Sequence, residues 1–311
     1  MAASVLRISS AQIFGNKSFF AAARMSQSVA KRCSSASIFK DDLFKNKVAL
    51  ITGGGSGIGY TIAEQLMKHK CDIAIASRNL EKLKNAAKQL ESTTGQKCHT
   101  IQMDVRKPED VINAVDETLK TYNKIDYLVN NAAGNFLCPV ASMSSNAFKT
   151  VMEIDTMGTF NVTKAVFDKY MQKNGGVILN ISATLHYRGN VLQAHAGAAK
   201  AAIDALTKHL ACEWGPLGIR VVGVAPGPIA DTEGYRKLGG KQLKGEIFDM
   251  YMKNIPLQRA GKRNEIANAV LFLLSDGGSL ITGETVVIDG GQNLSSPNSM
   301  FDIENIMKSN L

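Results

Sequence analysis

The chain has 311 residues, of which 45% are hydrophobic, enough for the core of one large α/β domain or two small ones. Its formal net charge of +9 is concentrated in the first 40 residues, which carry six basic side chains and no acid, so +3 remains from Asp41 onward. That ordinary balance argues against a general nucleic-acid-binding function.

Both ends of the chain resemble targeting signals. Residues 1–40 are rich in Ala, Ser and spaced Arg or Lys, which is typical of a mitochondrial transit peptide, with a disordered leader as the alternative. The last three residues, Ser309-Asn310-Leu311, loosely resemble the C-terminal Ser-Lys-Leu peroxisomal signal. The predicted location is therefore the peroxisome or the mitochondrial matrix. No apolar stretch approaches the roughly 20 residues of a membrane span, so none is expected.

The five cysteines and five histidines are scattered, without C-x-x-C or metal-ligand spacing. We interpret the cysteines as reduced, mostly buried thiols and expect no metal site.

From Asp41 onward, short apolar runs alternate with helical stretches. The predicted strands are KVALITG, CDIAIAS, TIQMDV, IDYLVNNA, GVILNISA, RVVGVAPG and ETVVIDGG. Helical segments such as PEDVINAVDETLKTY, introduced by Pro108, lie between them. Near-continuous apolar strands alternating with helices predict an α/β fold, a single-domain, doubly wound parallel sheet of the Rossmann type.

We place this domain at residues 41–291, followed by a C-terminal tail at 292–311. Residues 229–254 are polar and punctuated by glycine, and they follow the predicted strand RVVGVAPG. Ligands of doubly wound sheets bind beyond the carboxyl ends of the strands, so this segment is a candidate substrate lid, with a surface excursion as the alternative.

The segment TGGGSGIG, residues 52–59, follows the first predicted strand and opens the first helix. Glycines there permit a tight turn and close approach of a phosphate, and the helix N-terminus attracts a pyrophosphate. The predicted dinucleotide-binding residues of this turn are Gly53, Gly55, Ser56, Gly57, Ile58 and Gly59.

The end of the second predicted strand indicates which dinucleotide binds. Enzymes that prefer NAD usually carry an acid there, whereas this chain has Ser77 and Arg78, which suit the 2′-phosphate of NADPH. We therefore predict NADPH as the cofactor.

The T-G-x-x-x-G-x-G spacing, together with NNAAG (130–134), Pro226-Gly227 and Asp289-Gly290-Gly291, resembles the short-chain dehydrogenase/reductase family. The resemblance covers roughly Asp41 to Gly291. It implies further cofactor contacts from Asp104, Val105, Asn131, Ala132, Pro226, Gly227, Ile229 and Lys200, with a helix cap as an alternative for Asp104.

The reaction of that family usually depends on Asn, Ser, Tyr and Lys. Lys200 is kept and is expected to hold the nicotinamide ribose, but Ala196 stands at the tyrosine position and Ala183 at the serine position. Asp155 replaces the asparagine. Without either hydroxyl, we do not expect this chain to reduce ketones.

Reduction of a conjugated C=C bond next to a thioester needs no such hydroxyl, because the proton can go to carbon. Asp155 is the new ionisable group, so Asp155 and Lys200 are the predicted catalytic residues, with a purely structural ion pair as the alternative. Whether Asp155 itself or a water that it orients delivers the proton stays open. Tyr187 and His195 are weaker candidates for a replacement acid and are interpreted as surface or packing residues.

Segments such as IASR, NAAGNFLCP, HAGAAKAA and APGPIADTEG resemble the peroxisomal-type 2,4-dienoyl-CoA reductase branch of the family. Mitochondrial-type members carry a tyrosine where this chain has Leu185. The resemblance implies NADPH-dependent reduction of 2,4-dienoyl-CoA to 3-enoyl-CoA, an auxiliary step of unsaturated fatty acid β-oxidation. It also implies a homo-oligomer, with a tetramer expected, packed through the helices around 155–170 and 198–213.

The predicted acyl-CoA contacts are Arg78, Arg106, Phe136, Ser144, Ser145 and Asn146. A solvated loop charge is the alternative for Arg106, and a helix start is the alternative for residues 144–146. Two other functions stay open: another acyl-CoA double-bond reductase, such as a trans-2-enoyl-CoA reductase, and a non-catalytic NADPH-binding sensor or scaffold.

Overall fold

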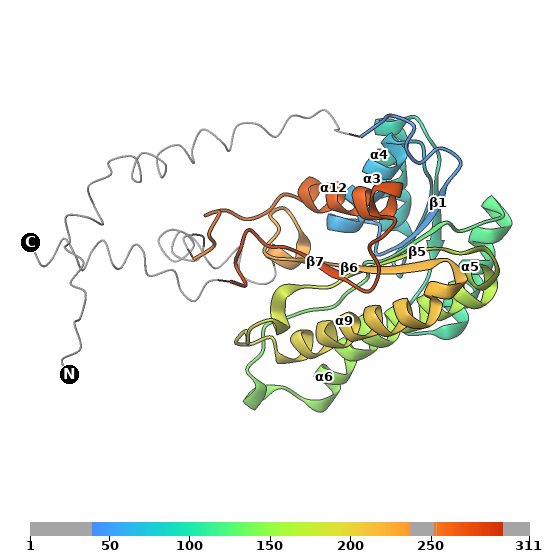
Figure 1. Cartoon of the computed structure of the whole chain (residues 1–311). Coiled ribbons are helices and arrows are strands. Elements are labelled where there is room, and N and C mark those ends of the chain that lie inside the picture. The colour runs from blue at the N-terminus through green and yellow to red at the C-terminus, as the bar shows by residue number, and fades with distance from the viewer. Residues whose placement is uncertain (1–38, 237–251, 253, 295–311) are drawn as a thin grey trace, which may run out of the picture. The chain divides into compact units, whose positions relative to one another are not determined.

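The computed structural model describes residues 39–236, 252 and 254–294 (Figure 1). By compactness the chain divides into Met1–Lys40 and Asp41–Leu311, and the second unit carries the fold. Nearly all of the predicted leader, most of the predicted lid and the Ser-Asn-Leu terminus lie outside the described residues.

The unit that begins at Asp41 is built on a seven-stranded parallel sheet with the order β3-β2-β1-β4-β5-β6-β7. The strands are β1 (Val48–Thr52), β2 (Asp72–Ser77), β3 (Cys98–Gln102), β4 (Tyr127–Asn130), β5 (Gly176–Ile181), β6 (Ile219–Pro226) and β7 (Thr285–Ile288). The strand order reverses between β1 and β4, where doubly wound sheets bind their ligands. The predicted doubly wound Rossmann-type fold is confirmed.

Helices cover both faces of this sheet. They are α3 (Gly57–Lys68), α4 (Leu80–Thr94), α5 (Pro108–Tyr122), α6 (Ser145–Met152), α7 (Gly158–Val166), α8 (Gln172–Asn174), α9 (Ala194–Trp214), α10 (Glu233–Tyr235) and α12 (Arg263–Leu274). Figure 1 shows α3, α4 and α12 on one side of the sheet and α5, α6 and α9 on the other. Both faces of the sheet are therefore shielded from solvent, which explains why the strands are nearly continuous runs of apolar residues.

Most predicted strands appear within two or three residues of their expected limits, and β3 differs most. The segment TIQMDV was expected to remain extended to Val105, but β3 ends at Gln102. The chain turns at Asp104, where the carboxylate accepts a hydrogen bond from the Arg106 backbone N–H at 3.1 Å. A local side-chain acceptor thus ends the strand earlier than its hydrophobicity suggests.

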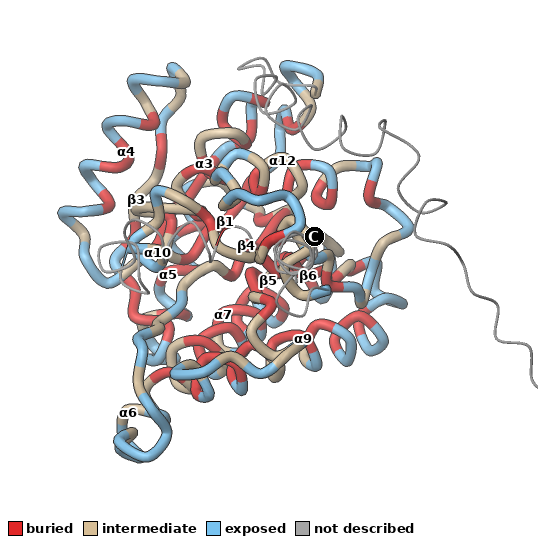
Figure 2. Tube along the Cα trace, turned by 90° about the vertical axis from the view of Figure 1, so that its left-hand side faces the viewer, coloured by how far each residue is buried: buried red, intermediate tan, exposed pale blue. Residues whose placement is uncertain are grey.

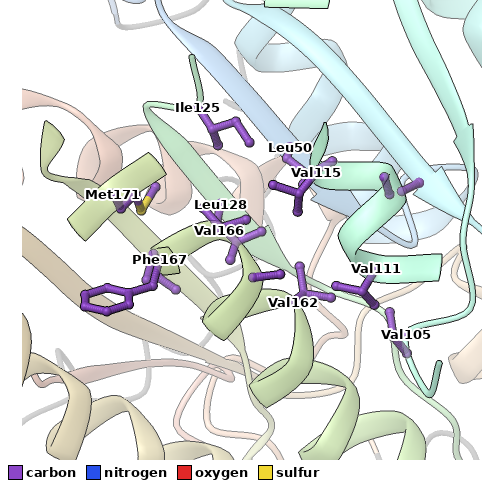
Figure 3. Close-up of a cluster of buried hydrophobic side chains, with 14 of the residues drawn as sticks. Leu50, Val105, Val111, Val115, Ile125, Leu128, Val162, Val166, Phe167 and Met171 are labelled. Carbon is purple, nitrogen blue, oxygen red and sulfur yellow. The ribbon is translucent and has the colours of Figure 1, made fainter. Parts of the chain in front are cut away.

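The main hydrophobic cluster lies between the sheet and helices α5 and α7. Leu50 of β1 and Leu128 of β4 pack against Val111 and Val115 of α5 and Val162 of α7 (Figure 3). At its edge, the ring of Phe167 stacks on Trp214 with centroids 4.0 Å apart. This cluster fixes α7 and α9 against the strands that carry the candidate site.

A buried polar ladder joins the same elements. The Asn130 side-chain amide donates to Thr163 Oγ1 of α7 at 2.8 Å and to Asn180 Oδ1 of β5 at 2.9 Å. The Asn180 amide donates in turn to Thr207 Oγ1 of α9 at 2.9 Å. Buried amides that lose these partners would be costly, so the ladder specifies how α7 and α9 are placed over the sheet.

Within the described residues, no helix is long and apolar enough to cross a membrane. The same part of the chain contains no group of three or more His, Cys, Asp or Glu arranged for a metal ion. Cys71 and Cys98 are buried thiols, whereas Cys138 is half-buried and Cys212 is exposed. The expectation of mostly buried thiols therefore holds for two of these four.

Candidate active site

The glycine-rich segment after β1 forms the tight turn that the sequence predicts. Gly53 has a φ of +67° and Gly57 one of +61°, a conformation that residues with a Cβ rarely adopt. A Cβ on Gly59 would lie 2.4 Å from Asn131 Nδ2 and 2.8 Å from the Gly53 carbonyl oxygen. Glycine is thus required here by backbone conformation and by close packing.

The turn ends at the N-terminus of α3, where Ser56 is the cap residue. Its side chain makes no capping hydrogen bond, so the first backbone N–H groups of the helix remain available to a ligand. Free N–H groups and the positive end of the helix dipole suit a pyrophosphate. Gly55 and Ile58 occupy the same half-buried turn.

Thr52 is a residue of this site that the sequence interpretation missed. Its hydroxyl accepts hydrogen bonds from the backbone N–H groups of Asn131 and Ala132, both at 2.9 Å. The Asn131 side chain donates back to the Thr52 and Gly53 carbonyl oxygens at 3.0 and 3.2 Å. Asn131 and Ala132 therefore brace the glycine turn, and the threonine that opens the motif was the available signal.

A cavity of about 370 Å³ lies at the carboxyl ends of β2 and β3. It is lined by Arg78, Gln102, Asp104, Lys107, Asp110 and Asn113. Arg78 is exposed at its edge and Ser77 is half-buried. Cationic Arg78 and Lys107 make this cavity a suitable place for the phosphorylated ribose of a dinucleotide.

Asp104 and Arg106, predicted to contact the cofactor and the substrate, bind each other. The Arg106 guanidinium donates to both Asp104 carboxylate oxygens, with Nε contacts of 3.0 and 3.1 Å. This bond lowers the pKa of Asp104 and raises that of Arg106. The cap of α5 is Lys107 rather than Asp104, so the helix-cap alternative for Asp104 is wrong. Val105, between them, is buried in the hydrophobic cluster.

The predicted contacts at the end of β6 also gather at the carboxyl edge. A Cβ on Gly227 would lie 2.6 Å from the Asp289 Cβ, so the strand end passes very close to the Asp-Gly-Gly segment. Pro226 ends β6, and Ile229 is buried and forms a bridge to Gly261. These contacts fix the direction in which the chain leaves the sheet.

The described start of the predicted lid lies beside the glycine turn. A Cβ on Gly57 would be 3.9 Å from the Thr232 side chain. Glu233, on α10, forms an ion pair with Lys82 of α4 at 3.3 Å. The chain that leaves β6 therefore returns over the cofactor turn.

Asp155 lies in a π-helical turn, Glu153–Met157, between α6 and α7. The extra residue in a π turn changes the direction in which the following side chains point, and such turns are frequent at functional sites. Here the Asp155 side chain is only 1% exposed, although polar Glu153 on the same turn is 40% exposed.

Lys200 and Asp155 meet in the interior. Lys200 Nζ lies 3.1 Å from Asp155 Oδ2 and donates to the Ile181 carbonyl oxygen at 3.0 Å. The other carboxylate oxygen of Asp155 accepts the Gly134 N–H at 2.7 Å. The two predicted catalytic residues, on different helices, thus form one hydrogen-bonded group with the end of the NNAAG segment.

No hydroxyl acid stands at the positions of the missing tyrosine and serine. Ala196 is buried at 1% exposure and Ala183 is half-buried. The Tyr187 hydroxyl donates to Asp204 Oδ2 at 3.0 Å, and burial together with the Asp204 charge raises its pKa. His195 is buried beside Phe136, with ring centroids 4.3 Å apart.

The predicted acyl-thioester contacts lie on an exposed excursion around α6 (Figure 2). Ser144 caps that helix, its hydroxyl accepting the Ala147 N–H at 3.1 Å, so the helix-start alternative is confirmed for Ser144. Ser145 and Asn146 are exposed in the first turn, and Phe136 is 36% exposed in the loop after β4.

The family model described as "Enoyl-(Acyl carrier protein) reductase" matches residues 53–293. A structure titled as a short chain dehydrogenase from Bacillus anthracis is 37% identical with a TM-score of 0.73, covering 81% of this chain and 99% of that one. The chain belongs to the short-chain dehydrogenase/reductase family. A citronellol catabolism dehydrogenase from Pseudomonas aeruginosa, 35% identical with a TM-score of 0.73, covers 83% of this chain and 99% of its own.

Curated relatives narrow the similarity within this short-chain dehydrogenase/reductase family. A protein of Danio rerio named "Peroxisomal 2,4-dienoyl-CoA reductase [(3E)-enoyl-CoA-producing]" is 60% identical over 270 residues, 87% of this chain and 88% of the relative. A protein of Arabidopsis thaliana with the same name is 45% identical over 269 residues, 83% and 88% of the two chains. The chain is therefore an oxidoreductase that uses a nicotinamide cofactor.

Proposed function

We propose that this protein reduces 2,4-dienoyl-CoA to 3-enoyl-CoA with NADPH. The observation that carries the proposal is the buried Asp155–Lys200 pair, in a chain whose tyrosine and serine positions hold Ala196 and Ala183. The relatives in fish and plant bear the name of this reaction. A sensor or scaffold would not need two charged side chains paired in the interior.

NADPH is the cofactor we propose, on three features of the chain. The Gly53–Gly59 turn and the α3 N-terminus accept a pyrophosphate. Ser77 and Arg78 replace the acid that would hold an unphosphorylated ribose. When bound, the reduced nicotinamide supplies the hydride that adds to the δ-carbon of the dienoyl thioester.

Lys200 supplies positive charge near the developing dienolate, whose negative charge spreads toward the thioester oxygen. Two of its three N–H groups are used on Asp155 and Ile181, which leaves one for the cofactor ribose or the substrate. Because its ammonium group is held from two sides, little reorganisation is needed during the reaction.

Asp155 determines how the proton reaches the α-carbon of the substrate. Its carboxylate lies between Lys200 Nζ and the Gly134 N–H, two donors that suit an acceptor at this place. An ionised carboxylate has about four acceptor positions, so two remain after these bonds. We propose that Asp155 orients a water molecule that delivers the proton to the α-carbon.

The same site suits a second, related reaction. The matching family model is described as an "Enoyl-(Acyl carrier protein) reductase", and a trans-2-enoyl-CoA takes up the same hydride and proton, with the hydride at the β-carbon instead of the δ-carbon. We place dienoyl reduction first because the relatives at 45–60% identity bear its name.

The assay mixes protein from Asp41 onward with NADPH and either 2,4-hexadienoyl-CoA or trans-2-hexenoyl-CoA, and determines the product by NMR. We expect NADPH oxidation with the dienoyl thioester and a double bond at carbon 3. Consumption with the monoenoyl substrate alone would favour the second reaction, and no consumption with either across chain lengths would refute both.

We further propose that the protein is located in the peroxisome, because the relatives are named peroxisomal. We also propose that it forms a homotetramer. Phe148, Met157 and Phe160 expose apolar side chains along the helix that carries Asp155, which is consistent with a subunit contact. Separate tagging of each terminus tests the location, and light scattering of the purified protein tests the oligomer.

A further inference from the structure

His195 is a buried polar residue of the active-site region to which the reaction above gives no role. It is the second residue of α9 and directly precedes Ala196. Its side chain is 0% exposed, and its ring lies against Phe136 at an interplanar angle of 37°. Neither ring nitrogen makes a hydrogen bond within the described part of the chain. An apolar ring would pack equally well without the desolvation cost of an unpaired N–H, so packing alone does not account for a histidine here.

The surroundings of His195 favour its neutral form. Burial lowers the pKa of the imidazole, while the Phe136 carbonyl and the Asp155 charge oppose that shift. The positive end of the α9 dipole also disfavours a cation in the first turn. Elements packed against α9 carry further titratable groups: Lys149 on α6, Glu153 and Asp155 on the π turn, and His186 before α9. Of these, Asp155 is the charge that acts on His195.

The Gly134–Phe136 segment connects His195 to Asp155. Its first residue donates the N–H that holds Asp155 Oδ1, and the ring of its last residue lies tilted against the imidazole. Between them, Asn135 donates to Gln193 Oε1 at 2.8 Å and accepts the Phe136 N–H at 2.8 Å. A shift of Phe136 would therefore be transmitted to the bond that orients Asp155.

We propose that His195 is a positioning residue of the reductase site: as a neutral imidazole beside Phe136 and Asp155, it holds the Gly134–Phe136 segment so that Gly134 stays bonded to Asp155. In this proposal one ring nitrogen donates to the Phe136 carbonyl when substrate is bound. Protonated His195 would be a second cation competing with Lys200 for Asp155, so turnover requires the neutral ring. The inference rests on the proposed function.

The test compares His195→Phe, which keeps the stacked ring and removes the nitrogens, with His195→Gln, which keeps a polar amide. His209→Phe, at an exposed position of the same helix, is the matched control. We expect kcat with 2,4-hexadienoyl-CoA to fall about tenfold in His195→Phe and to return to within about threefold of wild type in His195→Gln. The NADPH dissociation constant should be unchanged. In the wild type, protonation of His195 should lower kcat as the pH falls. That decrease should be absent from both variants, which have no imidazole at position 195.

Wild-type kcat and pH profile in His195→Phe would overturn the proposal, and so would equal impairment of the Gln and Phe variants. NMR titration of the imidazole needs no substrate and keeps the proposal testable if the Phe variant does not fold. We expect its midpoint to lie below that of an ordinary histidine, and to fall further in Asp155→Asn. An unchanged midpoint in Asp155→Asn would also overturn the proposal. Absence of dienoyl turnover in the wild type would instead refute the proposed function, since the NMR result stands independently of it.

Discussion

Replacing Asp155 with asparagine changes one atom of a group that holds two donors in place. The carboxylate accepts the Gly134 N–H on Oδ1 and Lys200 on Oδ2. An amide has a single oxygen, so its NH2 must face either the Gly134 N–H or the Lys200 ammonium, and one donor is left opposite another donor.

The structure sets the size of the effect. At 3.1 Å, two unit charges attract by about 5 kcal/mol at an effective dielectric constant of ~20. Desolvation offsets part of this attraction, and removing one partner of a buried pair typically costs about 3–5 kcal/mol. We therefore expect Asp155→Asn to lower the free energy of unfolding by about 4 kcal/mol and Tm by about 10 °C. We also expect kcat to fall by about 100-fold or more, with NADPH affinity nearly intact.

Glu153→Gln is the matched control, because Glu153 lies on the same π turn but forms an exposed pair with Lys149 at 3.6 Å. Its effect on unfolding should stay below about 1 kcal/mol. Denaturant unfolding, NADPH titration and steady-state turnover measure the three quantities. The reasoning is refuted if Asp155→Asn unfolds like Glu153→Gln. It is also refuted if its effect simply adds to that of Lys200→Met in a double-mutant cycle.

Three further outcomes follow from named contacts. Arg78→Glu should weaken NADPH binding by about 100-fold and NADH binding only slightly, and equal losses measured by fluorescence titration would contradict the 2′-phosphate assignment. Gly59→Ala, whose Cβ would overlap Asn131 Nδ2 at 2.4 Å, should lose about 1–3 kcal/mol of stability together with cofactor binding. Gly215→Ala, with no atom within 4 Å of the added Cβ, is the control and should leave both stability and cofactor binding unchanged. Arg259 lowers the pKa of Glu265, so this bond stabilises the fold above the usual glutamate range, and the stabilisation disappears as pH falls through the lowered pKa. The free energy of unfolding of Arg259→Gln should therefore differ from wild type by about 1 kcal/mol at pH 7, and the difference should shrink as the pH falls below the usual glutamate range.

Local patterns in the sequence were enough to predict the fold and the cofactor turn. The apolar strands, the helix that begins at Pro108 and the glycines at 53, 57 and 59 depend on backbone conformation and burial within a few neighbouring residues. The turn at Asp104 shows the limit of such reasoning, because hydrophobicity alone extended β3 too far. Similarly, the sequence of residues 144–149 fitted two interpretations, contact with the substrate and the start of a helix. The hydrogen bond from the Ala147 N–H to the Ser144 hydroxyl supports the helix start.

The sequence by itself determined that the chain is a doubly wound α/β protein with a dinucleotide turn, that Lys200 is kept, and that the tyrosine and serine positions hold Ala196 and Ala183. Only the tertiary structure decided which ionisable side chains come together in the candidate site. Asp155 and Lys200 are 45 residues apart, and they meet because a π turn and the packing of α7 and α9 over the sheet direct both side chains inward. The same packing buries His195 beside Phe136. Such pairs depend on which distant side chains face each other in three dimensions, which residue spacing along one chain does not specify.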